Sequence, residues 1–272
     1  MIIRVAAIAI FPMALFAQWP AYKNPAAPRL PNGKVNMDAP APKAADGHPD
    51  LSGVWDRGMI PGAPPPIPAN ALGTAPPKGP RPFQDLPSLF PDGLPFQSWA
   101  ADLRKQRLAV HSKDHPDAHC LPLNPVQLHS HPQPNKIMQE PGLILMLYEA
   151  NDGRRQIFMD GRTLPDNDAD PWWFGYSIGK WEGDTLVVQT TGFREPGWID
   201  EEGTPISNSA RVTERFRRLN YGTLEIATTV DDPKTFTRPW TFKLNQRLMP
   251  DTELIEFVCL ENNTGLQHLV GK

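Results

Sequence analysis

Residues 210–248 read ARVTERFRRLNYGTLEIATTVDDPKTFTRPWTFKLNQRL, and this stretch decides the fold. Three runs rich in β-branched, aromatic and leucine residues are separated by the turn signals Tyr-Gly and Asp-Asp-Pro. In the last run Trp240, Phe242 and Leu244 alternate with polar residues, so they share one face of a strand. The stretch therefore predicts sequential antiparallel strands, each with a buried side and a solvent-facing side.

The same alternation of strand-like segments and turn signals extends on both sides of this stretch. Eight segments with strand patterns follow one another, and a ninth, at residues 51–55, precedes them. So many twisted strands remove their edges most economically by closing on themselves. We expect a mainly β protein, an antiparallel up-and-down meander of about 8–10 strands closing into a lipocalin-like barrel, with a two-sheet β-sandwich as the alternative. The eight segments are residues 143–150, 155–161, 173–181, 184–193, 210–219, 223–231, 238–248 and 253–261.

Proline makes up 33 of the 272 residues and is concentrated in the N-terminal third. Each proline fixes φ and removes a backbone donor, which excludes a mostly helical protein. We expect residues 18–48 to form a Pro-rich extended or disordered arm. Residues 49–272 are expected to form a single barrel domain with an irregular Pro-rich insert at about 56–142. Within the insert, residues 95–112 predict one helix outside the barrel.

Residues 1–17, MIIRVAAIAIFPMALFA, have the pattern of a signal peptide. Arg4 precedes an apolar run that is too short to span a bilayer, and Pro12 disfavours the alternative of a buried N-terminal helix. We therefore expect a periplasmic or secreted protein with no stable membrane span. In such a compartment Cys120 and Cys259 are expected to form a disulfide, with two free buried thiols as the alternative.

Charge and motifs narrow the function classes. The 27 basic and 30 acidic residues give a net charge of −3, which argues against a nucleic-acid binder. The chain contains no G-x-S-x-G, H-E-x-x-H or P-loop motif and no G-x-G-x-x-G followed by a helix. We therefore expect no cofactor and a small molecule as the partner.

The chain contains the distinctive segments PDLSGVW (49–55), DGR (160–162), SIGKWEGDTLVVQTTGF (177–193), WID (198–200), TERF (213–216) and ELIEFVCLEN (253–262). Together they resemble a family of exported bacterial proteins that has no established activity. The Gly-x-Trp of the first segment is also similar to the first-strand motif of lipocalins. The resemblance implies export and a barrel, and it implies no reaction.

Two of these segments predict turns. Trp181-Glu182-Gly183-Asp184-Thr185 predicts a tight hairpin rather than a catalytic motif, because Gly183 can take a positive φ and Asp184 suits a turn. Asp160-Gly161-Arg162 predicts a strand end and a turn. Alternatively, Asp160 and Arg162 bind a polar ligand at the barrel mouth, since arginine presents a planar fork of donors.

Glu149, Glu214 and Glu256 each alternate with apolar residues and are therefore expected on inward faces of strands. A buried carboxylate needs a partner, for which the candidates are Arg162, Arg215 and Arg238. Glu214 and Glu256 are candidate catalytic residues, and Glu149 is a candidate ligand-binding residue. The alternative for each of the three glutamates is a structural ion pair, or a reversed facing of the strand that leaves the carboxylate in water.

Aromatic residues crowd the range 172–198. Trp172 and Trp173 cannot both point inward on a strand, so one of them is expected to be exposed or to lie at a rim. Such a rim suits a flat apolar or aromatic ligand or a sugar ring. The candidate ligand-binding aromatic residues are Trp172, Trp173, Tyr176 and Trp198. The clustered histidines are expected to be exposed loop residues rather than metal ligands, so no metal site is predicted. They are His111, His115, His119, His129 and His131.

Two functions follow from these residues. The first is an exported barrel protein that binds a small apolar or aromatic molecule, for which an open cavity is needed. The alternative is a cofactor-free hydrolase, lyase or isomerase that uses interior carboxylates as general acid and base. The enzymatic function requires two or more ionisable side chains to converge within one pocket.

Overall fold

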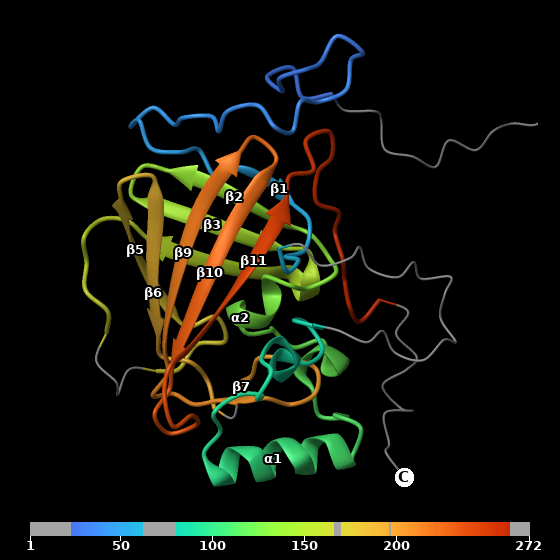
Figure 1. The fold of residues 1–272 in the computed structure, drawn as a ribbon, viewed down its shortest axis with the longest axis vertical. Coiled ribbons are helices and arrows are strands. Elements are labelled where there is room, and N and C mark those ends of the chain that lie inside the picture. The colour runs from blue at the N-terminus through green and yellow to red at the C-terminus, as the bar shows by residue number, and fades with distance from the viewer. Residues whose placement is uncertain (1–22, 62–79, 166–169, 196, 262–272) are drawn as a thin grey trace, which may run out of the picture.

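The computed structural model describes residues 23–61, 80–165, 170–195 and 197–261 (Figure 1). Its centre is one nine-stranded sheet, nearly closed into a barrel, with the strand order β1-β2-β3-β4-β5-β6-β9-β10-β11. The predicted mainly β barrel is confirmed. The strands of the sheet are β1 (Gly53–Trp55), β2 (Asn135–Glu140), β3 (Leu143–Tyr148), β4 (Gly153–Phe158), β5 (Tyr176–Glu182), β6 (Thr185–Thr191), β9 (Arg211–Asn220), β10 (Thr223–Asp231) and β11 (Trp240–Arg247).

The sheet departs from a pure meander at one place. All neighbouring strands pair antiparallel except β4 and β5, which run parallel with Ile157 opposite Ser177 and Phe158 opposite Ile178. The connection between these two strands is therefore not a hairpin. A short ribbon of β7 (Gly197–Trp198) and β8 (Pro205–Ile206) lies outside the large sheet.

The barrel closes where β11 meets the first strand. The amide of Asp56 donates to the Arg247 carbonyl at 2.8 Å, and Met59 and Asn245 exchange two backbone hydrogen bonds. The free edge of β11 is thus occupied by β1 and the residues that follow it. The strand predicted at residues 253–261 is wrong, because no edge of the sheet is left to pair with it. These residues form an irregular surface segment instead.

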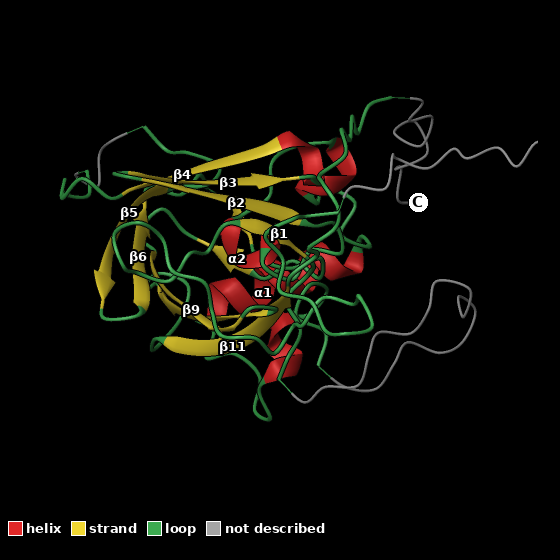
Figure 2. Cartoon of the chain, turned by 90° about the horizontal axis from the view of Figure 1, so that it is seen from above, coloured by secondary structure: helices red, strands yellow, loops and turns green. Residues whose placement is uncertain are grey.

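Five short or medium helices complete the described chain: η2 (Leu86–Leu89), α1 (Ser98–Ala109), η3 (Pro116–His119), α2 (Pro125–Leu128) and η4 (Ala150–Asp152). The predicted helix is confirmed as α1, which lies outside one end of the barrel (Figure 1). By contrast, α2 lies inside the ring of strands (Figure 2), and all four of its residues are buried. The sequence did not indicate α2.

Gly58, which follows β1, lets the backbone there approach the residue after α2 closely enough for a direct hydrogen bond. The amide of Gly58 donates to the carbonyl of His129, directly after α2, at 2.6 Å. A Cβ atom at Gly58 would lie 2.5 Å from that same oxygen, which no side chain tolerates. The turn after α2 is therefore fixed against the wall of the barrel.

The core consists of two apolar clusters with a polar layer between them. Phe216 on β9 belongs to the first cluster, and Val212 on the same strand belongs to the second. Glu214 lies between them in sequence and shares their inward face, as the alternation of the strand predicts. The polar layer thus crosses the middle of the barrel.

The described part of the N-terminal arm, residues 23–48, follows a series of tight turns over one end of the barrel (Figure 1). Ala27 and Ala39 pack in the first apolar cluster, so this part is held in place rather than disordered. His48 stacks on Trp181 with ring centroids 4.7 Å apart.

The predicted hairpin is confirmed, because Glu182 pairs with Thr185 and Gly183 has a φ of +60°.

The predicted signal peptide, residues 1–17, lies outside the described residues. In the part of the chain that the structure describes, no helix has the length and apolarity needed to cross a bilayer.

The predicted disulfide between Cys120 and Cys259 is confirmed, with a Cα–Cα distance of 5.5 Å. It ties the irregular C-terminal segment to the loop that follows η3.

We expect reduction, or Cys259→Ser, to lower the melting temperature by a few degrees, since the bond closes a loop of 139 residues in the unfolded chain. The effect should stay below the ~4–5 kcal/mol of the chain-entropy model, because the released segment packs loosely. Differential scanning calorimetry with and without reductant measures it. An unchanged melting temperature would contradict the expectation.

Candidate functional site

The polar layer inside the barrel is organised around Glu214. The guanidinium of Arg155 on β4 donates to both carboxylate oxygens, with Nη1 at 2.9 Å from Oε1. His129 donates from Nε2 to Oε1 at 2.5 Å, which requires a proton on Nε2. Arg155 also donates to the hydroxyls of Ser177 and Thr190, at 3.1 and 2.8 Å. Strands β4, β5, β6 and β9 and the residue after α2 thus meet at one ion pair.

Burial alone would raise the pKa of Glu214, since the side chain is completely inaccessible to solvent. The charge of Arg155 and the hydrogen bonds from His129 and Arg155 outweigh burial and lower the pKa to about 2. The pKa of Arg155 is raised well above its ordinary range, because Glu214 outweighs the effect of its burial. Both groups are therefore charged at every ordinary pH, and the pair is saturated with partners.

The inward position predicted for Glu214 is confirmed, but its predicted partners are wrong. Arg162, Arg215 and Arg238 are all exposed, because each lies on an outward position or in a loop. The partner is Arg155 on β4, whose sequence Gly-Arg-Arg-Gln-Ile-Phe gave no sign of an inward arginine.

The histidines do not behave as a set of exposed loop residues. His111 and His119 are exposed as expected, but His115, His129 and His131 are buried. Burial lowers the pKa of His115 to about 4, against the opposite effects of Asp117 and Gln127, so this ring is neutral at pH 7. The prediction of exposure failed because α2 carries its neighbouring histidines into the interior.

Glu256 and Glu149 are not in the interior. Glu256 is exposed, because its segment found no sheet edge to join. Glu149 is half-buried just after β3, whose buried residues are Ile144, Met146 and Tyr148. The facing assumed for this strand was therefore reversed. Every residue of β3 is apolar or aromatic, so the sequence did not reveal which set faces inward.

Four of the candidate ligand-binding residues form a cluster on the outside of the barrel. Arg162 forms an ion pair with Asp160 and donates to the Tyr176 hydroxyl at 3.0 Å. Trp172 packs edge-on against Tyr176, with ring centroids 5.6 Å apart, and is 46% exposed. Asp160 and Arg162 therefore bond to each other in a turn, as the sequence indicated. Their hydrogen-bonding groups are largely used within the cluster.

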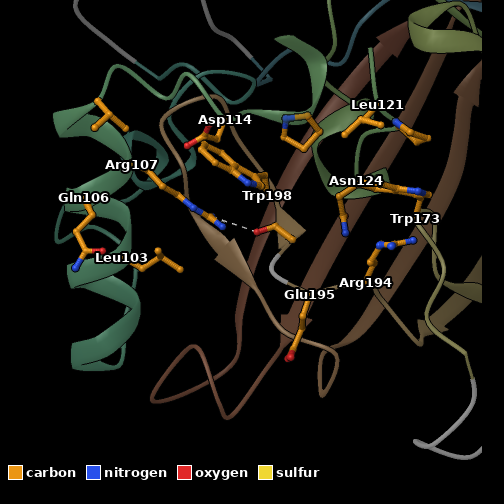
Figure 3. Close-up of a pocket in the computed structure, with 14 residues that line it drawn as sticks. Leu103, Gln106, Arg107, Asp114, Leu121, Asn124, Trp173, Arg194, Glu195 and Trp198 are labelled. Carbon is orange, nitrogen blue, oxygen red and sulfur yellow. Dashed lines mark hydrogen bonds between the residues drawn. The ribbon is translucent and has the colours of Figure 1, made fainter. Parts of the chain in front are cut away.

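Trp173 and Trp198 meet elsewhere, in a groove of about 850 Å³ next to α1 (Figure 3). We call it the α1 groove. It lies outside the barrel and combines one face of α1, the loop that precedes α2, and the chain around β7. Its lining residues are Leu103, Gln106, Arg107, Val110, Asp114, Pro116, Leu121, Pro122, Asn124, Trp173, Arg194, Glu195, Gly197 and Trp198.

Trp198 is held rigidly in this groove. The Arg107 guanidinium lies over its ring at 3.9 Å from the centroid, and His115 packs edge-on at 5.2 Å. Arg107 also donates to the carbonyls of Gly197 and Gly203, at 3.2 and 3.1 Å. Burial lowers the pKa of Arg107 to about 10, although Asp200 and Asp114 act in the opposite direction. The arginine stays charged at neutral pH, and the ring is fixed before any ligand arrives.

Sequence reasoning missed Arg107, Asn124 and Arg194, which supply the polar groups of the α1 groove. Arg107 is one of the cationic residues of an ordinary-looking helix, and Asn124 sits in a Pro-rich loop. For Arg194, the signal would have been its short distance in sequence from Trp198, within the aromatic-rich range 172–198.

Comparison of the chain with protein-family models, with curated proteins and with solved structures finds no match. Among the described residues, no group of three or more histidine, cysteine, aspartate and glutamate side chains is arranged to hold a metal ion. The structure therefore offers an aromatic groove on the outside of the barrel and a layer of paired charges on the inside.

We expect Glu214→Gln to reduce the free energy of unfolding by about 3 kcal/mol or more, because it leaves the charge of Arg155 buried without a counterion. Urea denaturation measures the loss. Glu182→Gln is the matched control, since Glu182 pairs with Arg215 on the exposed outer face and should cost under about 0.5 kcal/mol. The double variant Arg155→Met, Glu214→Gln should lose less than the sum of its single variants. Equal losses in the two glutamine variants would contradict a structural role.

The acid limb of the stability curve should depend on the same carboxylate. The pKa of Glu214 is lowered from 4.5 to about 2 on folding, so its contribution is complete above pH 4.5 and is lost as the pH falls toward 2. A shift of this size corresponds to about 3 kcal/mol. Unfolding free energies measured from pH 6 to pH 2 should fall more steeply for the wild-type chain than for Glu214→Gln. Parallel curves would show that Glu214 has an ordinary pKa.

Proposed function

We propose that the protein binds a small apolar or aromatic molecule in the α1 groove and does so outside the cytoplasm. The observation that carries this proposal is that Trp173 and Trp198 both line one groove of about 850 Å³. Grooves of this size with few polar groups are the usual form of small-molecule sites. The disulfide supports an oxidising compartment.

The barrel interior is less suited to the ligand. α2 and His129 occupy the middle of the barrel, where the His129 carbonyl also accepts a hydrogen bond from Gln246 at 3.1 Å. Glu214 and His129 are fully buried, and Arg155 is 1% exposed. A lipocalin-like outline places the ligand inside the barrel. We place it instead in the α1 groove, at the end of the barrel.

A second candidate function, a cofactor-free hydrolase, lyase or isomerase, is favoured by the convergence of Glu214, Arg155 and His129. A base, an acid and an anion-stabilising group lie within hydrogen-bond distance of one another there. A substrate would reach them only after α2 withdrew from the barrel. For that reason binding in the α1 groove is the stronger proposal.

We expect Trp173→Ala to weaken binding of a neutral aromatic probe, 2-naphthamide, by tenfold or more, because the ring loses one wall of the groove. Trp172→Ala is the matched control, since its exposed side chain belongs to the outer cluster. Isothermal titration calorimetry gives both dissociation constants. No binding to the wild-type protein, or equal effects of the two variants, would refute the proposed site. Native mass spectrometry of the purified protein would identify any molecule that occupies the groove.

A further inference from the structure

The lining of the α1 groove carries two arginines, Arg107 and Arg194, and two carboxylates, Asp114 and Glu195. Asp114 lies on the same lining as Arg107 and acts on its charge. Glu195 accepts a hydrogen bond from the Asn208 amide at 2.7 Å and lies 3.9 Å from Lys234, and Figure 3 shows its side chain directed away from Trp198. The cations near these two carboxylates are thus Arg107 and Lys234.

Arg194 is the cation that remains. Within the part of the chain that the structure describes, its guanidinium has no carboxylate at ion-pair distance and donates no side-chain hydrogen bond. It lies over the ring of Trp173, 5.1 Å from the centroid, which holds it at the groove. Figure 3 shows it directed toward Asn124. The groove therefore carries an exposed guanidinium that has no carboxylate partner among the described residues.

Asn124 offers a second donor at the same place. Its side-chain oxygen accepts a hydrogen bond from the Val126 amide at 3.0 Å, which fixes the orientation of the side chain. The NH₂ group then points the other way and has no acceptor among the described residues, although Asn124 is only 7% exposed. A nearly buried amide donor beside an unpaired guanidinium is the arrangement that a carboxylate fills.

The groove also has an apolar lining. Leu103 of α1, Val110 directly after it, and Leu121 and Pro122 of the loop contribute to it together with the two tryptophans. A flat ring fits such a slot, because aromatic and aliphatic walls remove it from water without a demand for hydrogen bonds.

We propose that the ligand of the α1 groove is an apolar or aromatic monocarboxylic acid. Its carboxylate is bound by Arg194 and the NH₂ group of Asn124, and its ring lies on Trp173 and Trp198. This assignment rests on the proposed function and adds the charge of the ligand. One unpaired cation favours a single negative charge over a dianion such as a phosphate monoester, which would need further donors.

The test compares two probes of nearly the same shape, 2-naphthoate and 2-naphthamide, by isothermal titration calorimetry at pH 7 and low salt. We expect wild-type protein to bind the acid at least tenfold more tightly than the amide. Arg194→Gln should remove this preference. Arg211→Gln, an exposed residue on the outer face of β9, is the control and should preserve the preference.

Asn124→Asp provides a second variant that keeps the fold. An aspartate oxygen still accepts the hydrogen bond of the Val126 amide, but the donor becomes a negative charge. This variant should bind the acid less tightly than the amide. Equal affinities of both probes for the wild-type protein, or a preference that survives Arg194→Gln, would overturn the assignment and leave the proposed groove intact. Failure of both probes to bind would instead refute the proposed function itself.

Discussion

The buried contact between Arg155 and Glu214 is the constraint on which the rest of the barrel depends. Two full charges inside an apolar core are tolerated only when each is surrounded by partners, and here every neighbouring element supplies one. β4, β5, β6 and β9 must therefore hold their registers within a fraction of an ångström. His129 ties α2 to the same carboxylate, so the helix that fills the barrel is held by charge as well as by apolar packing.

This filling determines where a ligand can go. Barrels of this size have room either for side chains or for one small ligand. Here α2 and the ionic layer occupy the middle, and the apolar clusters occupy both sides of it. The space that remains lies where irregular segments meet at the end of the barrel, and loops on a rigid scaffold are the common location of binding sites. The insert between β1 and β2 supplies two of the three walls of the α1 groove.

The sequence predicted those features that depend on local pattern. Glu214 faces inward because its strand alternates cleanly, and the Gly183 turn joins β5 to β6 because a glycine with positive φ fits a two-residue hairpin. Pattern failed where the choice depended on tertiary contacts. Because every residue of β3 is apolar or aromatic, its sequence did not show which face is buried. The segment around Glu256 has the composition of a strand, but no free edge of the sheet is left to pair with it. The pairing of Glu214 with Arg155, 59 residues apart, is a property of the closed barrel and has no local signal.

The segment Trp198-Ile199-Asp200 shows why a distinctive motif need not be a catalytic one. Burial raises the pKa of Asp200 to about 6, against hydrogen bonds from Thr204 and the Leu86 amide that lower it. A carboxylate in this position costs stability at neutral pH, yet it fixes the turn between β7 and β8. That turn presents the Gly197 and Gly203 carbonyls to Arg107, and Arg107 in turn holds the ring of Trp198. The buried aspartate therefore helps to fix the Trp198 side of the α1 groove. In the binding that we propose, this surface would need no ordering, and affinity gained by preorganisation requires no additional contact area.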